Sequence, residues 1–504
     1  MGKERKLLRT VFGDETTAER FPWMNKAMLL YSGAVMICFV LFLIAPFVTF
    51  ISKTPLDHIQ AYLGLLGAGL LCLDVVTSKV LWRGRYCVLL YGLCALAAVA
   101  SVRTISYGVR DNLFLLCWTA IQFAIFYTLP KRTSAETLRK FAAWVFGILA
   151  VIWMVAVLIS LWQYVIQKGY RYVVDPTADD SSTARQGFIE HRLFGIFNPL
   201  NHAAMVSVML LLTGLYYIVK NRRVWVRVLL GVCCLAWLSH ILLSGSRNAQ
   251  VCLLVCAAAT GFLVARNRTS SWKGFRQAVV ILTSAVLAAV LTLGCFVGMK
   301  SALAQVPRAW EAHHLSSGQQ LQNGQQNPQN IPIIGEAETQ TMLDRPELED
   351  NLSNDRFTIW TDYMSLHRQI GLVGLSPGNY MGYVAEHAPD LYIVRYVRDE
   401  FPGKFSGGLI CHVHNGYLMT FVSTGWLGVA LMAAFIFLSV IRLVKYLIRS
   451  KRVSAEFMLA LVLVLVGAIS AVFDKAVFFM NNAHTFIFWL ALGVVNHLPL
   501  PEQE

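Results

Sequence analysis

Charged residues are scarce in this 504-residue chain, at 14% of positions, whereas an ordinary soluble domain has roughly 25%. Hydrophobic residues make up 56% of the chain, and the mean hydropathy is +0.54. This balance excludes a single water-soluble core, because a chain of this length would leave too much apolar surface in water. The composition is typical of a polytopic membrane protein.

The sequence also has little that points to disulfides, to a cleavable leader or to an internal repeat. Most of its 11 cysteines lie inside apolar runs, where cysteine acts as a small hydrophobic residue, and Cys411 has no evident partner in the polar loops. The first apolar run begins near Ala27 and is too long for the apolar region of a signal peptide. We therefore expect neither a disulfide framework nor a cysteine-based metal site, and no cleavable signal peptide.

Twelve apolar runs of about 20 residues, the length of a membrane-spanning helix, follow one another along the chain. They lie at 28–50, 59–77, 86–102, 112–129, 141–165, 200–219, 226–243, 249–266, 277–298, 417–443, 455–473 and 478–497. We predict an all-α polytopic membrane protein with about twelve transmembrane helices and a large loop domain between the ninth and tenth.

Clusters of Lys and Arg occupy alternate connections between these runs. They lie at 79–85, 131–140, 220–227, 266–276 and 442–452. Because Lys and Arg concentrate in cytoplasmic loops, the alternation places both tails, 1–27 and 498–504, in the cytoplasm. The two membrane regions, 28–298 and 417–497, then expose their long connections, 166–199 and 299–416, on the outer side.

The net charge of +14 is explained by this topology. From Lys300 to Cys411 there are 8 basic and 13 acidic residues, so this outer segment carries −5 and the remainder +19. The positive charge is therefore concentrated in the predicted cytoplasmic connections, and we expect no nucleic-acid partner.

The large outer loop has recognisable parts. Residues 316–330 are rich in Gln, Asn, Ser and Gly, which is typical of a flexible segment. Residues 353–370 have a loose apolar stripe at helical spacing, and the segment 371–380 that follows is predicted to stop the helix and turn.

Four polar residues mark the predicted outer side: Arg192, Arg247, Arg356 and His414. An Arg at membrane depth is costly and usually faces a polar cavity with a partner. The Arg guanidinium also suits bidentate binding of phosphate oxygens, and a His can exchange a proton near neutral pH. Together they would form a pyrophosphate site with a base.

Each residue also has a purely structural interpretation. Arg247 can extend to lipid headgroups, Arg192 can be an ordinary loop charge, and Arg356 can pair with Asp355 or Asp362. His414 alone is more often a hydrogen-bonded structural residue. His412 and His414 can also share one face of an extended segment and hold a metal, but no third ligand is evident nearby, so we expect no metal.

The segment that starts at His414 carries a specific pattern: His414-Asn415, nine residues, then Gly425-Trp-Leu-Gly428. It resembles the signature of bacterial O-antigen ligases, with the spacing intact. Three shorter patches resemble the same ligase and polymerase superfamily. They are Arg192-Leu-Phe-Gly-Ile-Phe-Asn-Pro-Leu-Asn201, Ser244-Gly-Ser-Arg-Asn-Ala249, and 356–380. The first has an inserted Leu200, and the last lacks the usual Pro of its turn and has Ser376 near an expected Gly.

This resemblance implies a metal-independent, inverting glycosyltransferase without a cofactor, at the periplasmic face of the bacterial inner membrane. The implied donor is a glycan on undecaprenyl pyrophosphate, and the acceptor of a ligase is lipid A–core. The resemblance implies that His414 is the base. It implies that the donor pyrophosphate is bound by Arg192, Arg247 and Arg356. The protein would also contact membrane lipids.

Other functions remain open at this stage. A polymerase would transfer the glycan to another lipid-linked repeat unit, but the His-Asn-x9-Gly-x2-Gly spacing favours a ligase. A lipid-glycan flippase would be expected to have two similar halves and no large outer domain. A secondary transporter would carry charges near the membrane midplane, whereas Asp74 and Asp474 lie near predicted span ends.

Overall fold

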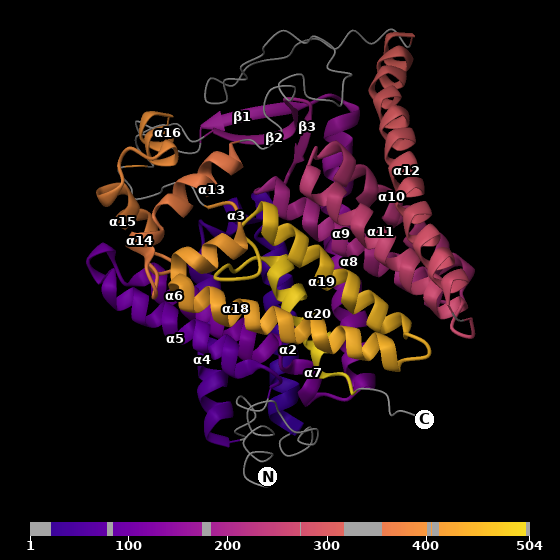
Figure 1. The fold of residues 1–504 in the computed structure, drawn as a ribbon. Coiled ribbons are helices and arrows are strands. Elements are labelled where there is room, and N and C mark those ends of the chain that lie inside the picture. Colours follow the sequence, from indigo (N-terminus) through magenta and orange to yellow (C-terminus); the bar gives the residue numbers. More distant parts are fainter. Residues whose placement is uncertain are drawn as a thin grey trace.

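A computed structural model describes residues 22–77, 84–173, 183–272, 274–316, 355–400, 405 and 413–499 (Figure 1). Most of the 316–330 tract, as well as Cys411 and His412, lies outside these residues. The described chain is predominantly helical, in agreement with the predicted polytopic membrane fold.

The helices before the first long loop form one side of the bundle. They are α2 (Pro22–Leu41), α3 (Ala45–Ile51), η1 (Pro55–His58), α4 (Ile59–Thr77), α5 (Cys87–Arg103), η3 (Ile105–Tyr107), α6 (Arg110–Ile121), η4 (Gln122–Phe126), α7 (Leu129–Arg132) and α8 (Ala135–Val165). The helices from that loop to the outer segment are α9 (Leu200–Lys220), α10 (Val224–Leu243), α11 (Arg247–Arg268) and α12 (Phe275–Ser316). The remaining helices are α13 (Arg356–Ser365), α14 (His367–Ile370), α15 (Tyr380–His387), α16 (Tyr392–Glu400), α18 (Gly416–Arg449), α19 (Ala455–Phe473) and α20 (Ala483–His497).

Ten helices in the described residues are long and apolar enough to cross a membrane. The predicted spans at 86–102 and 478–497 correspond to the shorter helices α5 and α20, of 17 and 15 residues. The span predicted at 277–298 belongs to α12, which continues to Ser316 and extends along one edge of the molecule (Figure 1).

The first predicted span, 28–50, is interrupted in the structure. Helix α2 ends at Leu41, and α3 starts at Ala45 with Pro46 in its first turn. Proline lacks the N–H that a continuous helix needs, so the helix cannot run through this point. The interruption is paired with the loop after β3: Ala45 N donates to Ile196 O at 2.8 Å, and Asn198 N donates to Leu43 O at 2.9 Å.

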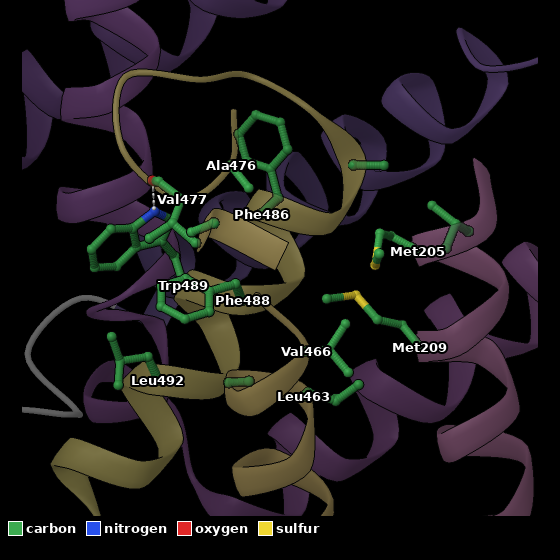
Figure 2. Close-up of a cluster of buried hydrophobic side chains, with 14 of the residues drawn as sticks. Met205, Met209, Leu463, Val466, Ala476, Val477, Phe486, Phe488, Trp489 and Leu492 are labelled. Carbon is green, nitrogen blue, oxygen red and sulfur yellow. Dashed lines mark hydrogen bonds between the residues drawn. The ribbon is translucent and has the colours of Figure 1, made fainter. Parts of the chain in front are cut away.

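The last predicted span begins later than the sequence indicates. Residues 474–482 are not helical, and α20 begins after Asn482, whose side chain accepts a hydrogen bond from Thr485 N. The apolar residues 476–479 are instead a buried loop packed on α20. Figure 2 shows Val477 accepting a hydrogen bond from Trp489 Nε1 at 2.8 Å. Hydropathy alone cannot separate a buried loop from a helix, since both are apolar.

The first long loop contains a small antiparallel sheet that the all-α prediction did not include. Its strands are β1 (Gly169–Val173), β2 (Thr183–Ile189) and β3 (Arg192–Gly195), in the order β1-β2-β3. Gly169 pairs with Gly187, and a bulge at Gly187 and Phe188 shifts the register towards β3. The sheet covers the same end of the bundle as α13–α16 (Figure 1).

Helix α18 is broken at Gly425, where φ is 64° and ψ is −165°. The backbone groups released by the break pair with the turn after α14. Leu375 N donates to Val422 O at 2.8 Å, and Trp426 N donates to Gly371 O at 3.2 Å. The outer helices α13–α16 are thereby attached to the helix that begins just after His414.

The basic connections gather at one end of α9–α11, α18 and α19. There, Lys220 Nζ lies 2.8 Å from Glu456 Oε1, and Arg266 donates to the carbonyls of Leu447 and Ser450. The opposite ends of the same helices carry the residues predicted on the outer side. The basic connections at 220–227, 266–276 and 442–452 thus lie at the end of these helices opposite to His414 and Arg247.

Candidate functional site

His414 stands immediately before the first turn of α18. Asn415 forms the helix cap, and its Oδ1 accepts hydrogen bonds from Tyr417 N and Leu418 N, both at 2.9 Å. His414 itself has a φ of 50°, a left-handed conformation that is uncommon for a residue other than glycine. Its side chain is 34% exposed. The cap and the backbone turn thus fix the direction of an accessible imidazole.

Gly416, the first residue of α18, allows His414 to approach a carboxylate. Gly416 packs against the loop after α19, and a Cβ atom at this position would collide with the Ala476 carbonyl oxygen. This close approach places His414 Nδ1 3.7 Å from Asp474 Oδ1. The same oxygen accepts a hydrogen bond from Lys475 N at 2.8 Å.

Asp474 is shared between two imidazoles. His202, in the first turn of α9, has its Nε2 3.7 Å from Asp474 Oδ2. Burial alone would raise the pKa of the Asp474 carboxyl, but the two imidazoles beside it and the Lys475 N–H outweigh burial and hold the pKa well below its usual value. Asp474 is therefore a carboxylate at neutral pH and a suitable partner for a protonated His414.

Arg192 lies on β3 and joins two of the predicted patches. Its Nε donates to Ser244 O at 2.7 Å, and its guanidinium Nη2 donates to Asn201 Oδ1 at 3.2 Å. Asn201 directly precedes His202. The contacts therefore connect the Ser244 turn through Arg192 and Asn201 to the His202, Asp474 and His414 group.

The Ser244 turn delivers Arg247 to the same end of the bundle. Gly245 has a φ of 63°, which glycine adopts readily, and Arg192 packs over it. Arg247 is the first residue of α11 and is half-buried. Its neighbour Asn248 donates to Ser470 Oγ at 3.5 Å, which ties α11 to α19 one turn before Asp474.

Arg356 is the predicted site residue that these contacts do not connect to the others. It opens α13 and is half-buried. The carboxylate of Asp362 accepts a hydrogen bond from Ile393 N at 3.4 Å, which ties α13 to α16. Arg356 can reach the His414 site only through the position of α13–α16, which the turn at 371–376 joins to α18.

The two glycines of the signature have structural roles. Gly425 has a conformation that only glycine adopts readily, and a Cβ atom there would collide with the Leu372 carbonyl group. At Gly428 a Cβ atom would collide with Thr424 Oγ1, which donates to Thr420 O at 2.6 Å. The signature therefore includes the cap and the break of α18, the helix that begins just after His414.

Sequence reasoning did not select Asp474 or His202 as site residues. The sequence does carry a signal for Asp474, since a carboxylate between two long apolar runs is a functional candidate by default. His202 lies in the patch that begins at Arg192, but its partner is 272 residues away and only the fold reveals the contact.

No group of three His, Cys, Asp or Glu side chains that could hold a metal occurs in the described part of the chain. His412 lies outside the described residues, so the pairing of His412 with His414 on one metal stays a hypothesis. His414 faces a carboxylate that a second imidazole, His202, also approaches, and this arrangement suits proton transfer.

Residues 234–433 match the family model described as O-antigen ligase. The match supports the O-antigen ligase and polymerase superfamily that the motifs resemble. The matched range includes Arg247, Arg356 and the whole segment from His414 to Gly428, whereas Arg192, His202 and Asp474 lie outside it. No curated protein and no solved structure matches the chain. This match supports a glycosyl-transfer enzyme of the O-antigen ligase type in a multi-pass membrane protein, with a lipid-linked glycan and a lipid acceptor as partners in general terms.

Proposed function

We propose that this protein is an inverting, metal-independent glycosyltransferase that moves a glycan from undecaprenyl pyrophosphate to lipid A–core. The observation that carries the proposal is the exposed His414 imidazole, fixed by the Asn415 cap and backed by the Asp474 carboxylate at 3.7 Å. A histidine held against a carboxylate in this way is the arrangement of a general base.

The reaction can be written around this pair. The Nδ1 side of His414 faces Asp474, so we assign Nε2 to the acceptor hydroxyl. As the hydroxyl oxygen attacks the anomeric carbon, its proton passes to Nε2 and Asp474 stabilises the imidazolium that forms. The bond between the anomeric carbon and the pyrophosphate oxygen breaks, undecaprenyl pyrophosphate leaves, and attack from the opposite side inverts the configuration.

The leaving pyrophosphate needs fixed positive charge in place of a metal. Arg247 and Arg356 are assigned to its oxygens, because a guanidinium presents two parallel N–H donors to a phosphate group. Two N–H groups of Arg192 already donate to Ser244 O and Asn201 Oδ1. We therefore propose that Arg192 positions the Ser244 turn and adds positive charge to the donor site.

The proposed site faces the periplasm from the inner membrane. The support is the position of three basic connections at the end opposite to His414, since Lys and Arg concentrate in cytoplasmic loops. A reporter that is active only outside the cytoplasm should work when fused after Asn327 and fail after Arg223 or Arg449. Activity after Arg223 would place the site on the cytoplasmic side and overturn this orientation.

A ligase and a polymerase are distinguished by what a cell without this protein makes. The lipopolysaccharide of a deletion strain should be separated on a gel. Loss of all long-chain glycan from lipid A–core, with lipid-linked polymer accumulating, is the expected result for a ligase. Core that carries a single repeat unit would instead identify the alternative, a polymerase. Loss of the glycan from lipid A–core with the lipid-linked glycan accumulating on the cytoplasmic side would instead favour a flippase.

Metal independence is tested separately. Purified protein should keep its transfer activity in excess chelator, since the proposed cations are side chains. Activity that is lost in chelator and restored by a divalent ion would revive the metal hypothesis for His412 and His414.

A further inference from the structure

The Asp474 carboxylate faces two imidazoles, and the proposed reaction uses only one of them. Oδ1 lies 3.7 Å from His414 Nδ1, and Oδ2 lies 3.7 Å from His202 Nε2. The His414 side chain is 34% exposed, whereas those of His202 and Asp474 are 12% and 14% exposed. His202 is thus on the inner side of the carboxylate, away from the accessible base.

We propose that His202 is a positioning residue that shares the Asp474 carboxylate with His414 and so sets the acid limit of transfer. This inference rests on the proposed function, in which His414 is the base. His202 would act in two ways. It orients the carboxylate from the Oδ2 side. It also reduces the negative potential that the carboxylate exerts on His414, which limits how strongly His414 retains a proton.

His202 is itself held from both sides. Asn201, the residue before it, accepts a hydrogen bond from Arg192 at 3.2 Å. On the other side, the His484 ring of α20 packs edge-on against the His202 ring, with centroids 5.2 Å apart and an interplanar angle of 68°. His484 is fully buried, and neither of its nitrogens has a hydrogen-bond partner among the described residues. His202 therefore lies between the buried His484 ring and the Asp474 carboxylate.

The electrostatic argument gives a sign to each substitution. A carboxylate next to a histidine favours the protonated imidazole. Removing the carboxylate with Asp474→Asn should therefore move the acid limb of the pH–rate profile to lower pH. Removing His202 leaves the whole carboxylate charge to His414, so His202→Ala should move the acid limb to higher pH. A role limited to packing would move neither limb.

Several other charged or titratable groups lie on the elements around His202, Asp474 and His414. The loop after α19 contributes Lys475, β3 contributes Arg192, and α11 begins with Arg247. On α10, His240 has its Nδ1 2.8 Å from Ser207 Oγ. Glu456, at the other end of α19, pairs with Lys220. His202 and His414 are thus the imidazoles that share the Asp474 carboxylate.

The test is a pH–rate profile of purified full-length protein. The donor is lipid-linked glycan extracted from the deletion strain, and the acceptor is lipopolysaccharide from the same strain. For His202→Ala we expect kcat to fall roughly 10- to 100-fold, the range seen for partners that orient a reactive group. The acid limb of the pH–rate profile should shift to higher pH by about half a unit, within the effect of a neighbouring charge. His202→Gln should restore both, because its amide N–H reaches the place of Nε2.

His240→Gln is the matched control, since it removes a buried imidazole from a helix packed on α9 that faces Ser207 instead of Asp474. Its acid limb should coincide with that of the wild type. If His202→Ala does not fold, His202→Asn replaces it, because the shorter amide does not reach Oδ2. The inference is overturned if the acid limb of His202→Ala lies at the same pH as that of the wild type. It is also overturned if the acid limbs of the Asn and Gln variants lie at the same pH. Transfer that survives in His414→Ala would instead overturn the proposed function beneath it.

Discussion

Gly416 and Ala476 are in direct contact, and there is no room between them for a methyl group, because a Cβ atom on Gly416 would overlap the Ala476 carbonyl oxygen. This contact joins the start of α18 to the loop after α19. It is the reason that a histidine at position 414 and a carboxylate at position 474 lie within 3.7 Å of each other.

Gly416→Ala should therefore separate His414 from Asp474 without changing either residue. We expect transfer to fall by roughly tenfold or more, since the base would lose its oriented partner. Binding of undecaprenyl pyrophosphate, measured by thermal shift, should be retained. Gly231→Ala is the control, because nothing lies within 4 Å of a Cβ atom at that glycine. Full transfer by Gly416→Ala would show that the contact is dispensable.

Gly425→Ala should release the outer helices from α18. The φ of 64° and ψ of −165° at this residue are strained for any side chain, at about 1–3 kcal/mol, and a Cβ atom would also collide with the Leu372 carbonyl group. We expect a lower melting temperature in detergent and faster proteolysis within 356–400. Gly147→Ala, at an open position in α8, should be neutral or slightly stabilising. Equal melting temperatures for the two variants would contradict this role of Gly425.

The lowered pKa of Asp474 predicts how its contribution to stability depends on pH. A carboxyl whose pKa is lower in the folded state stabilises the fold above its unfolded pKa of about 3.9, and this contribution is lost as pH falls through the folded value. Asp474→Asn should thus melt below the wild type at pH 7, and the difference should shrink below about pH 4. Glu136→Gln, on an exposed helix pair with Lys140, should show little difference at any pH. A gap between wild type and Asp474→Asn that stays constant to pH 3 would argue against this coupling.

Arg247→Ala and Arg356→Ala should each weaken both donor binding and transfer. Hydrogen bonds to charged groups contribute about 1.5–3 kcal/mol, so we expect roughly tenfold or more weaker binding of undecaprenyl pyrophosphate. Lys at either position should rescue only in part, since it lacks the planar fork. Arg227→Ala, at the basic end of the bundle, is the control. Normal donor binding by Arg356→Ala would remove the outer helices from the pyrophosphate site.

The sequence was sufficient for most of the membrane fold because long apolar runs and alternating basic connections follow directly from the bilayer. It failed at 42–44, where the backbone pairs with the loop after β3, and at 478–482, where Met480 O accepts a hydrogen bond from the side chain of Gln122. A local pattern does not reveal such pairing, because a buried loop is as apolar as a buried helix. The small sheet at 169–195 was missed for a related reason, since its strands are short and lie in a polar connection.

The candidate site was predictable to a similar degree. His414 and the three arginines were named from residue type, position and a spaced motif, and the contacts join Arg192 to the Ser244 turn as one group. The contact between Asp474 and His202 became visible only through the fold, because 272 residues separate the two side chains in sequence. The role of Gly425 also depends on its contact with Leu372, which no spacing rule describes.

The central claim, that His414 is the base, is tested most directly by measuring transfer and donor binding for His414→Ala in parallel. The variant should fold, bind undecaprenyl pyrophosphate as the wild type does, and transfer glycan roughly 10²- to 10⁴-fold more slowly, as expected after loss of a general base. His412→Ala, two residues earlier, should transfer at nearly the normal rate. Near-normal transfer by His414→Ala, with transfer abolished in His412→Ala, would contradict the account.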